Sequence, residues 1–342
     1  MTPDGCDQSR VVVDASGRGH GFTNCRDAVT GAHHLGYVEG SGTTWHTTVT
    51  TISSFVVSAA DDGTNTYALA FTPGRQVRLV IRSRSGHLSS TLLQHTPNSA
   101  WADGSIIAAG GRWWAVWSVP DAACGCSHLW TARTMSTPYG SHNTYLRGIQ
   151  PSLALRGRSS VLAWLKDGRS AAADGTTGVV AVGYPTATGF TQNVVGVRGA
   201  LYPVVATVGG SPVLNWQSRL NGAWGVEFRQ LTASGWVGRR LGPTVDRSVD
   251  PDHALFTDPV PMQVGPHTVS LAWTTRRSST TTVTVLARRI GSTWTTTLVG
   301  DGRPGGHGNR VAALSGSGAH LDLILTHIGT STTEYYDVRR RL

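Results

Sequence analysis

Leu162-Ala163-Trp164 ends a short apolar strand, which follows an earlier strand, Leu153-Ala154-Leu155, and a turn at Arg156-Gly157. The same arrangement, a strand of small and apolar residues that ends in a large aromatic, recurs roughly every 50 residues. The other copies end at Phe22, Phe71, Trp117, Trp216 and Trp273, and a seventh copy, Leu325-Thr326-His327, has lost the aromatic. The chain is therefore a repeat protein, and this strand pair begins each repeat.

Each repeat continues with a polar loop, an alternating third strand and a fourth strand rich in Thr and Val, such as Thr47-Thr48-Val49-Thr50. Four strands per repeat with a periodic Gly and aromatic mark are typical of propeller blades. The sequence predicts an all-β, seven-bladed β-propeller of four-stranded blades of about 50 residues, in one domain over 10–342 after an N-terminal segment, 1–9. The last repeat has only three readable strands.

The composition also favours strands and turns. Charged residues make up 14%, Gly numbers 42, and Glu occurs at Glu39, Glu227 and Glu334 alone. The net charge is +9, which attracts anions in general. Nucleic acid is disfavoured as a partner, because the longest basic run is Arg339-Arg340-Arg341 and no motif combines aromatic and basic residues. The use of Arg in place of Lys fits a GC-rich bacterial genome.

The four cysteines indicate an oxidising compartment, because they lie in polar, Gly- and Asp-rich surroundings. We expect a disulfide between Cys6 and Cys25, and either a tight Cys124–Cys126 bridge or pairs across loops. A zinc site with His128 is the alternative, which the short Cys124-Gly125-Cys126 spacing disfavours, so we expect no metal. The polar N-terminus is not a signal peptide and no apolar run is long enough to span a membrane, so we expect a secreted protein whose signal is removed or lies upstream.

Two Gly-aromatic turns resemble degenerate Asp boxes, the mark of sialidase-like β-propellers. The turn that ends at Trp45 keeps Gly42 and Thr44, and the turn that ends at Trp294 keeps Gly291 and Thr293. The Asp position of the full box is Gly40 in the first turn and Arg289 in the second. The resemblance implies a propeller architecture, and the boxes of that family are structural. A generic Gly-aromatic turn is the alternative interpretation.

The resemblance also implies what a catalytic set would contain. Sialidases hold a carboxylate with three Arg and use a Tyr nucleophile paired with a Glu, together with an Asp acid/base. The early Arg-Ile-Pro motif is absent, because Arg10 is followed by Val11-Val12. Glu227 and Tyr336, with its neighbour Tyr335, are the residues that a Tyr/Glu pair would use here. Both types are also ordinary residues of pleated strands.

Other candidates lie on loops that share one face of a propeller: the connections between second and third strands, and those between repeats. Arg can grip a carboxylate with two hydrogen bonds, Asp accepts from sugar hydroxyls and His works as an acid or base. The ligand-binding candidates are Arg26, Arg75, Arg169, Arg219, Arg277, Asp250 and Trp101, with Asp252 and His253 as catalytic candidates in the long excursion 242–260. Solvated loop charge is the alternative for each charged candidate, and Trp101 is a candidate because a loop Trp can stack on a sugar ring.

These features predict a secreted propeller that recognises acidic carbohydrate through one loop-lined face. The loops differ between repeats, which indicates one site and disfavours a multivalent lectin. The alternatives are a sialidase-like glycoside hydrolase or polysaccharide lyase, and an extracellular protein-interaction scaffold, because fold alone does not choose among them. We expect an extracellular or cell-wall glycan as the partner, no cofactor, no transmembrane segment and a monomer.

Overall fold

The computed structural model describes most of the 342 residues. The described residues are 3–14, 16–27, 29–41, 44–96, 103–134, 141–157, 159–167, 178–186, 190–220, 223–243, 260–265, 267–276, 282–299, 309–317, 320–328 and 333–341. Their regular structure is entirely β, and every strand pairs antiparallel with the next strand in its sheet. The prediction of an all-β propeller is confirmed.

Four of the sheets contain four strands each, in chain order. The first holds β1 (Pro3–Val13), β2 (Gly19–Asp27), β3 (His33–Ser41) and β4 (Thr44–Val49). The second holds β5 (Phe55–Asp61), β6 (Asn65–Thr72), β7 (Gln76–Ser83) and β8 (Leu88–His95). The other two hold β16 (Ala200–Val208), β17 (Ser211–Leu220), β18 (Ala223–Thr232) and β19 (Gly235–Pro243), and β20 (Met262–Val264), β21 (Thr268–Arg276), β22 (Thr282–Ile290) and β23 (Thr293–Val299).

The remaining strands form a sheet of seven and a sheet of three. The seven-stranded sheet holds β9 (Gly104–Ala109), β10 (Arg112–Asp121), β11 (Cys126–Arg133), β12 (His142–Arg156), β13 (Ser159–Lys166), β14 (Val179–Gly183) and β15 (Asn193–Arg198). The three-stranded sheet holds β24 (Asn309–Ser317), β25 (His320–Ile328) and β26 (Thr333–Arg341).

The prediction of seven separate four-stranded blades is wrong. The described strands form six sheets, of which four have four strands. The cause is β12, a single strand of 15 residues that pairs with β11 near its start and with β13 near its end. The sequence divides the third and fourth repeats at this point, whereas the backbone continues through it and joins them into one sheet.

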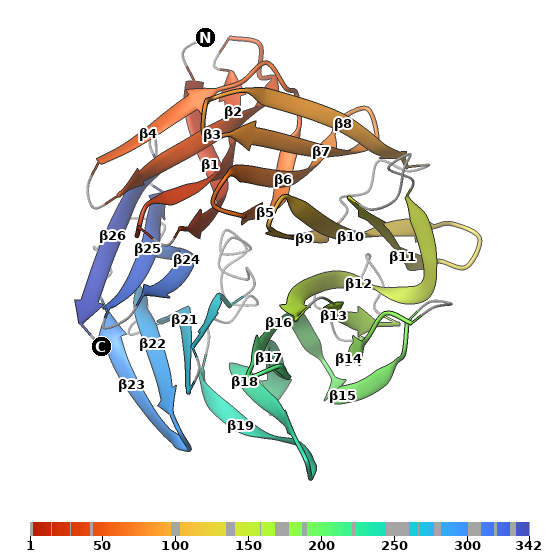
Figure 1. The fold of residues 1–342 in the computed structure, drawn as a ribbon, viewed down its shortest axis with the longest axis vertical. Helices are drawn as coiled ribbons and strands as arrows, with labels where there is room; N and C mark the ends of the chain where they lie inside the picture. The colour runs from red at the N-terminus through yellow and green to blue at the C-terminus, as the bar shows by residue number, and fades with distance from the viewer. Residues whose placement is uncertain are drawn as a thin grey trace.

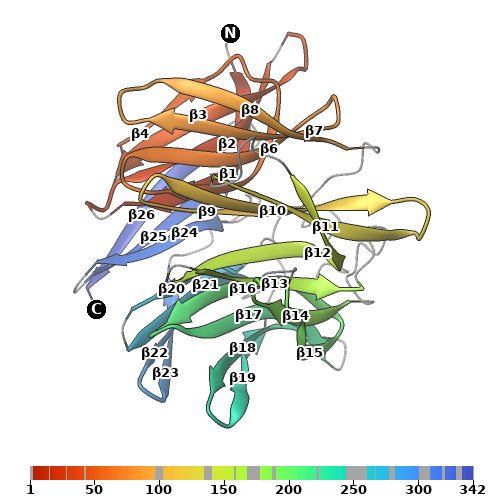
Figure 2. The same ribbon diagram turned by 45° about the vertical axis from the view of Figure 1, so that its right-hand side comes forward.

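Figure 1 shows the sheets arranged around one axis, with β1, β5, β9, β16 and β24 innermost. The first strands of consecutive repeats contact one another in the order β1, β5, β9, β12, β16, β20 and β24, and β24 returns to contact β1. Figure 2 shows the last sheet beside the first one. Contact between β24 and β1 therefore brings the two ends of the repeat array together.

The repeated aromatics lie on the second strand of each repeat and form the core between sheets. Phe22, Trp117 and Trp164 are fully buried, and Trp216 is 2% exposed. The apolar clusters around them combine adjoining sheets: Trp117 packs with residues of β6 and β7, and Trp216 packs with residues of β13 and β14. Removing one such aromatic costs about 3–5 kcal/mol, so these residues are the main apolar contacts that hold the ring together.

Serine side chains form hydrogen bonds between the first strands of neighbouring repeats, which we call the inner strands, at equivalent positions. Ser58 of β5 accepts a hydrogen bond from the backbone N–H of Ile106 at 3.1 Å. Ser105 of β9 accepts from Leu153 at 3.0 Å, and Ser152 of β12 accepts from Val205 at 3.1 Å. We call these three bonds the serine ladder.

The N-terminal segment is part of the first sheet, because β1 begins at Pro3 and the boundary expected at residue 10 lies inside it. Cys6 faces Cys25 of β2 in the strand register, and the two form a disulfide. Cys25 is 1% exposed, so this disulfide is buried at one end and fixes the start of the chain against β2.

Candidate functional site

The candidate site lies where the inner strands begin. Gly104 of β9 faces Trp117, the repeated aromatic of β10, and Asp103 precedes it. In the next two repeats the register shifts opposite the aromatic, between Ile149 and Ser152 and between Leu201 and Val204. Gln150 and Tyr202 lie in these bulges, so Asp103, Gln150 and Tyr202 occupy equivalent positions in three consecutive repeats. With Arg10 of β1 they form what we call the axial cluster.

Two members of the axial cluster have an unusual backbone. Gln150 has φ 52° and Tyr202 has φ 50°, a left-handed conformation that costs a residue with a side chain about 1 kcal/mol or more. Each residue precedes a proline, Pro151 or Pro203, which disfavours the right-handed helical conformation. The bulges turn backbone N–H groups toward the neighbouring inner strand.

Hydrogen bonds join the axial cluster from one repeat to the next. The backbone N–H of Gln150 donates to the carboxylate of Asp103. The side-chain oxygen Oε1 of Gln150 accepts from the backbone N–H of Tyr202 at 2.6 Å. Arg10 donates from Nε to the carbonyl of Val57 at 3.0 Å, which fixes its side chain on the same ring of strands.

The environment of Asp103 changes its acidity. Burial raises the pKa of Asp103 to about 6, while the hydrogen bond from Gln150 and the positive charge of Arg10 act in the opposite direction and compensate only in part. A carboxyl group with this pKa changes between its neutral and ionised forms close to neutral pH. It can accept a hydrogen bond from a ligand hydroxyl when ionised, or donate a proton when neutral.

The predicted arginines Arg26, Arg75 and Arg219 lie at the same end of their sheets as Asp103. Because the strands alternate in direction, the connection between the second and third strands lies at the end where the first strand begins. Arg26 is near the end of β2, Arg75 lies between β6 and β7, and Arg219 lies near the end of β17. All three side chains are exposed. We call this end of the sheets the loop face.

Backbone hydrogen bonds fix the position of Arg75 on the loop face. Its φ is 63°, its N–H donates to the carbonyl of Thr72 at 3.1 Å, and its own carbonyl accepts from the N–H of Thr96 at 2.7 Å. At the β2–β3 connection, the carboxylate of Asp27 accepts from the N–H groups of Val29 at 2.9 Å and Thr30 at 2.8 Å. These bonds hold two of the loops in defined turns.

Glu227, a catalytic candidate from the sequence, lies inside a sheet. Its residue is 9% exposed, and its carboxylate lies 3.3 Å from both Arg229 and Arg240. The hydroxyl of Ser218 also donates to it, at 3.1 Å. A carboxylate held by two arginines in this way fits an ion pair that stabilises the sheet. Its catalytic role stays a prediction.

Asp250, Asp252, His253, Trp101, Arg169 and Arg277 lie outside the described residues. Tyr336 is described as backbone alone: it belongs to β26 and faces Leu325 of β25. The roles expected for these residues stay predictions.

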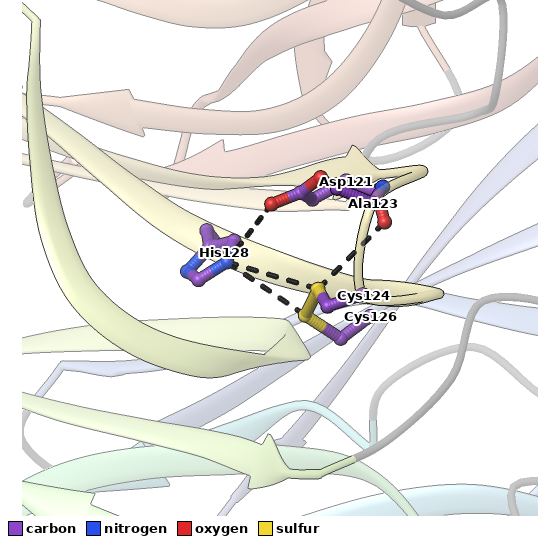
Figure 3. The surroundings of a disulfide bond; sticks show 5 residues. All are labelled: Asp121, Ala123, Cys124, Cys126 and His128. Carbon is purple, nitrogen blue, oxygen red and sulfur yellow. Dashed lines mark hydrogen bonds and ion pairs between the residues drawn. A yellow bond between two sulfur atoms is a disulfide. The ribbon is translucent and has the colours of Figure 1, made fainter.

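A second polar group lies in the turn between β10 and β11, also on the loop face. Figure 3 shows the disulfide Cys124–Cys126 and the carboxylate of Asp121 near the same ring nitrogen of His128. One potential ligand atom from each of Cys124, Cys126 and His128 lies within 4.8 Å of the others. The zinc interpretation needs thiolate sulfur, and here the two sulfurs are bonded to each other. Of the two pairings left open by the sequence, the structure has the tight bridge.

A buried histidine lies toward the opposite end of the first sheet. His20 is 3% exposed, and its ring nitrogens contact the carboxylate of Asp14 and the hydroxyl of Tyr37, both at 3.0 Å. Burial, followed by the positive charge of Arg84, lowers the pKa of His20. This group is near the turn between β1 and β2 and belongs to the packing of the first two sheets.

Asp103, Gln150 and Tyr202 were not predicted from the sequence. One signal was present: Gln150-Pro151 and Tyr202-Pro203 each lie in the apolar stretch that precedes a repeated aromatic, Trp164 or Trp216. Nothing in the sequence alone connects Asp103 to them, because the connection is a hydrogen bond between residues in different repeats.

The chain matches no protein-family model and no curated protein. Among solved structures, it is similar to the β-propeller domain of the Trilobed protease from Pyrococcus furiosus, with a TM-score of 0.57 and 8% identity, over 98% of this chain and 94% of that one. The endosialidase of phage phi92 has a TM-score of 0.54 and 11% identity, over 98% and 67%. The Aleuria aurantia lectin AAL, in a complex with Fucalpha1-6GlcNAc, has a TM-score of 0.50 and 10% identity, over 87% and 97%.

At these identities the likenesses show the fold alone. The fold defines the protein as an all-β propeller. The Asp-box interpretation of the turns at Trp45 and Trp294 stays an interpretation. The described residues include no helix with the length and apolar character needed to cross a membrane. The two disulfides fit an oxidising environment.

Proposed function

We propose that this propeller is secreted and binds acidic carbohydrate on its loop face, at a site centred on Asp103. The observation that carries the proposal is the identity of the residue at this position. Gln150, the equivalent residue one repeat later, makes the same kind of inter-repeat hydrogen bond with a neutral side chain. A carboxylate is therefore not needed for the structure, and its burial is unfavourable, as its pKa of about 6 indicates. A group that opposes stability and differs between repeats is a candidate for function.

The arginines of the loop face supply the complementary charge. Arg26, Arg75 and Arg219 are exposed on three different sheets. A guanidinium group binds a carboxylate through two parallel hydrogen bonds, which suits the uronic or sialic acid units of an acidic glycan. In this proposal the arginines hold the sugar carboxylate, and ionised Asp103 accepts hydrogen bonds from sugar hydroxyls.

A glycan array with the purified, oxidised protein tests this function, with both retention of protein and loss of the printed sugar recorded. We expect retention on intact acidic glycans, weakened by Asp103→Asn and by Arg26→Gln, Arg75→Gln or Arg219→Gln. Arg112→Gln is the matched control, because Arg112 is exposed at the opposite end of its sheet, at the start of β10. Equal losses with Arg112→Gln would indicate a general effect of charge, and no retention at all would contradict carbohydrate binding.

Hydrolysis of the glycan is the second candidate, and the pKa of Asp103 is the observation that favours it. A general acid that works near neutral pH needs a raised pKa of this kind. Glycoside hydrolases usually employ two carboxyl groups, and the axial cluster supplies one. Binding therefore has the stronger support. Loss of printed sugar with the wild-type protein, abolished by Asp103→Asn, would favour the enzyme.

A further inference from the structure

The disulfide Cys124–Cys126 differs from the other disulfide in what it can contribute to stability. Cys6–Cys25 joins two strands and spans 19 residues of sequence, whereas Cys124–Cys126 closes a loop over a separation of two. The flanking residues Pro120 and Ser127 already pair across β10 and β11. A cross-link within so short a loop removes little freedom from the unfolded chain, so stability does not explain this bond.

The turn also leaves the disulfide open to a reacting partner. Cys124 is exposed and Cys126 is half-buried. Gly125 between them has φ 57°, and no other described part of the molecule lies within 4 Å of where its side chain would be. Cys25 of the other disulfide is buried. The chain therefore carries one accessible disulfide and one protected disulfide, and exposed disulfides are the more readily reduced ones.

Groups that can assist proton transfer lie beside the accessible disulfide, as Figure 3 shows. The His128 nitrogen Nε2 lies 3.7 Å from the sulfur of Cys126 and 4.0 Å from that of Cys124. The same nitrogen lies 3.3 Å from the carboxylate of Asp121 on β10, which orients it. Arg147 of β12 faces His128 in the strand register. The imidazole is thus closer to the half-buried sulfur, and Asp121 and Arg147 are its charged neighbours.

We propose that Cys124–Cys126 is a redox-active disulfide that oxidises dithiols, such as a peptide or protein with two nearby cysteine thiols. This activity is independent of the carbohydrate site. The exposed Cys124 is the sulfur that a substrate attacks, and the half-buried Cys126 is the leaving group, beside the nitrogen that can give it a proton. Accessibility, a short loop and an adjacent acid/base are the requirements for thiol–disulfide exchange.

The reaction balances in two steps. A substrate thiolate attacks the sulfur of Cys124, the Cys124–Cys126 bond breaks, and Cys126 leaves as a thiolate that takes a proton from protonated His128. The second substrate thiol then loses its proton to water and attacks the substrate sulfur of the mixed disulfide, which releases Cys124 as a thiolate that is protonated by solvent. The substrate dithiol loses two electrons and two protons and becomes a disulfide, and Cys124 and Cys126 become two thiols.

Equilibration with glutathione tests the proposal, with the Cys6–Cys25 pair as the control in the same molecule. The whole protein is incubated in buffers with increasing ratios of reduced to oxidised glutathione and a chelator, then alkylated, and the four cysteines are measured by peptide mass. We expect Cys124 and Cys126 to become alkylated while Cys6 and Cys25 stay oxidised and the near-UV circular dichroism stays native. If both pairs are reduced together, or neither is reduced before unfolding, the proposal is wrong.

The role of His128 is tested by the rate at which dithiothreitol reduces the bond. We expect His128→Asn to slow reduction of Cys124–Cys126 roughly tenfold or more, with an unchanged rate at Cys6–Cys25. Cys124→Ser should abolish the reaction, and circular dichroism will show whether the variant is folded. An unchanged rate of reduction in a folded His128→Asn variant would contradict the role of the imidazole.

Discussion

Asp103 is a residue at which stability and the proposed function make opposite demands. Burial raises the pKa of its carboxyl group to about 6, so the folded protein holds this proton more tightly than the unfolded chain does. The stability that protonated Asp103 contributes is fully present below pH about 4, near the pKa of an unperturbed Asp. It is lost as the pH rises through about 6. The carboxylate therefore lowers stability at neutral pH.

We expect Asp103→Asn to raise the free energy of unfolding by about 1–3 kcal/mol at pH 8 and to change it little at pH 4, because the variant has no proton to lose. Urea unfolding followed by tryptophan fluorescence measures both values. Asp27→Asn is the control with the opposite sign, since hydrogen bonds from the backbone and side chain of Thr30 and from Val29 lower the pKa of Asp27. A variant of Asp103 that is less stable at pH 8 would contradict this account.

The elements of the ring depend on bonds between repeats as well as on the bonds within each sheet. The serine ladder makes one such bond between each pair of neighbouring inner strands from β5 to β16. In each case a serine hydroxyl accepts from a backbone N–H of the next inner strand. Loss of the hydroxyl therefore takes the partner away from a partly buried donor.

We expect Ser152→Ala to lower the free energy of unfolding by about 1–3 kcal/mol, since it removes the acceptor for the N–H of Val205. Ser85→Ala is the matched control, because Ser85 is exposed in a turn and its hydroxyl bonds to the hydroxyl of Ser83, two residues away. The measurement is urea unfolding of both variants at one pH. Equal effects of the two substitutions would show that the ladder contributes nothing specific.

Some of these elements could be predicted from the sequence and some could not. The strands that end at Phe22, Trp117 and Trp164 were predictable, because a buried aromatic leaves a periodic mark in the sequence. The continuity of β12 was not, because Gly148 and Pro151, residue types that are typical of turns, lie within a bulged strand. The sequence pattern of a register shift within a strand does not differ from the sequence pattern of a loop.

At the scale of the whole molecule, the loop face could be predicted from the sequence and the axial cluster could not. Arg26, Arg75 and Arg219 were identified from their places between second and third strands, which the antiparallel order of a repeat fixes. Asp103 was not predicted, because the burial that raises its pKa and its interactions with Gln150 and Arg10 depend on parts of the chain that are distant in sequence. Contacts between repeats are a property of the closed ring and cannot be read from one repeat.

The central claim is that a carbohydrate ligand binds at Asp103, and its most direct test is the pH dependence of affinity. The acidic glycan retained best on the array is titrated by calorimetry at pH 5 and pH 7.5, into the wild-type protein and into Asp103→Asn. We predict that wild-type affinity rises by up to about tenfold between these values, as Asp103 ionises, and that the variant binds more weakly with no such rise. Equal affinity of the two proteins at both pH values would contradict the claim and place the ligand elsewhere on the molecule.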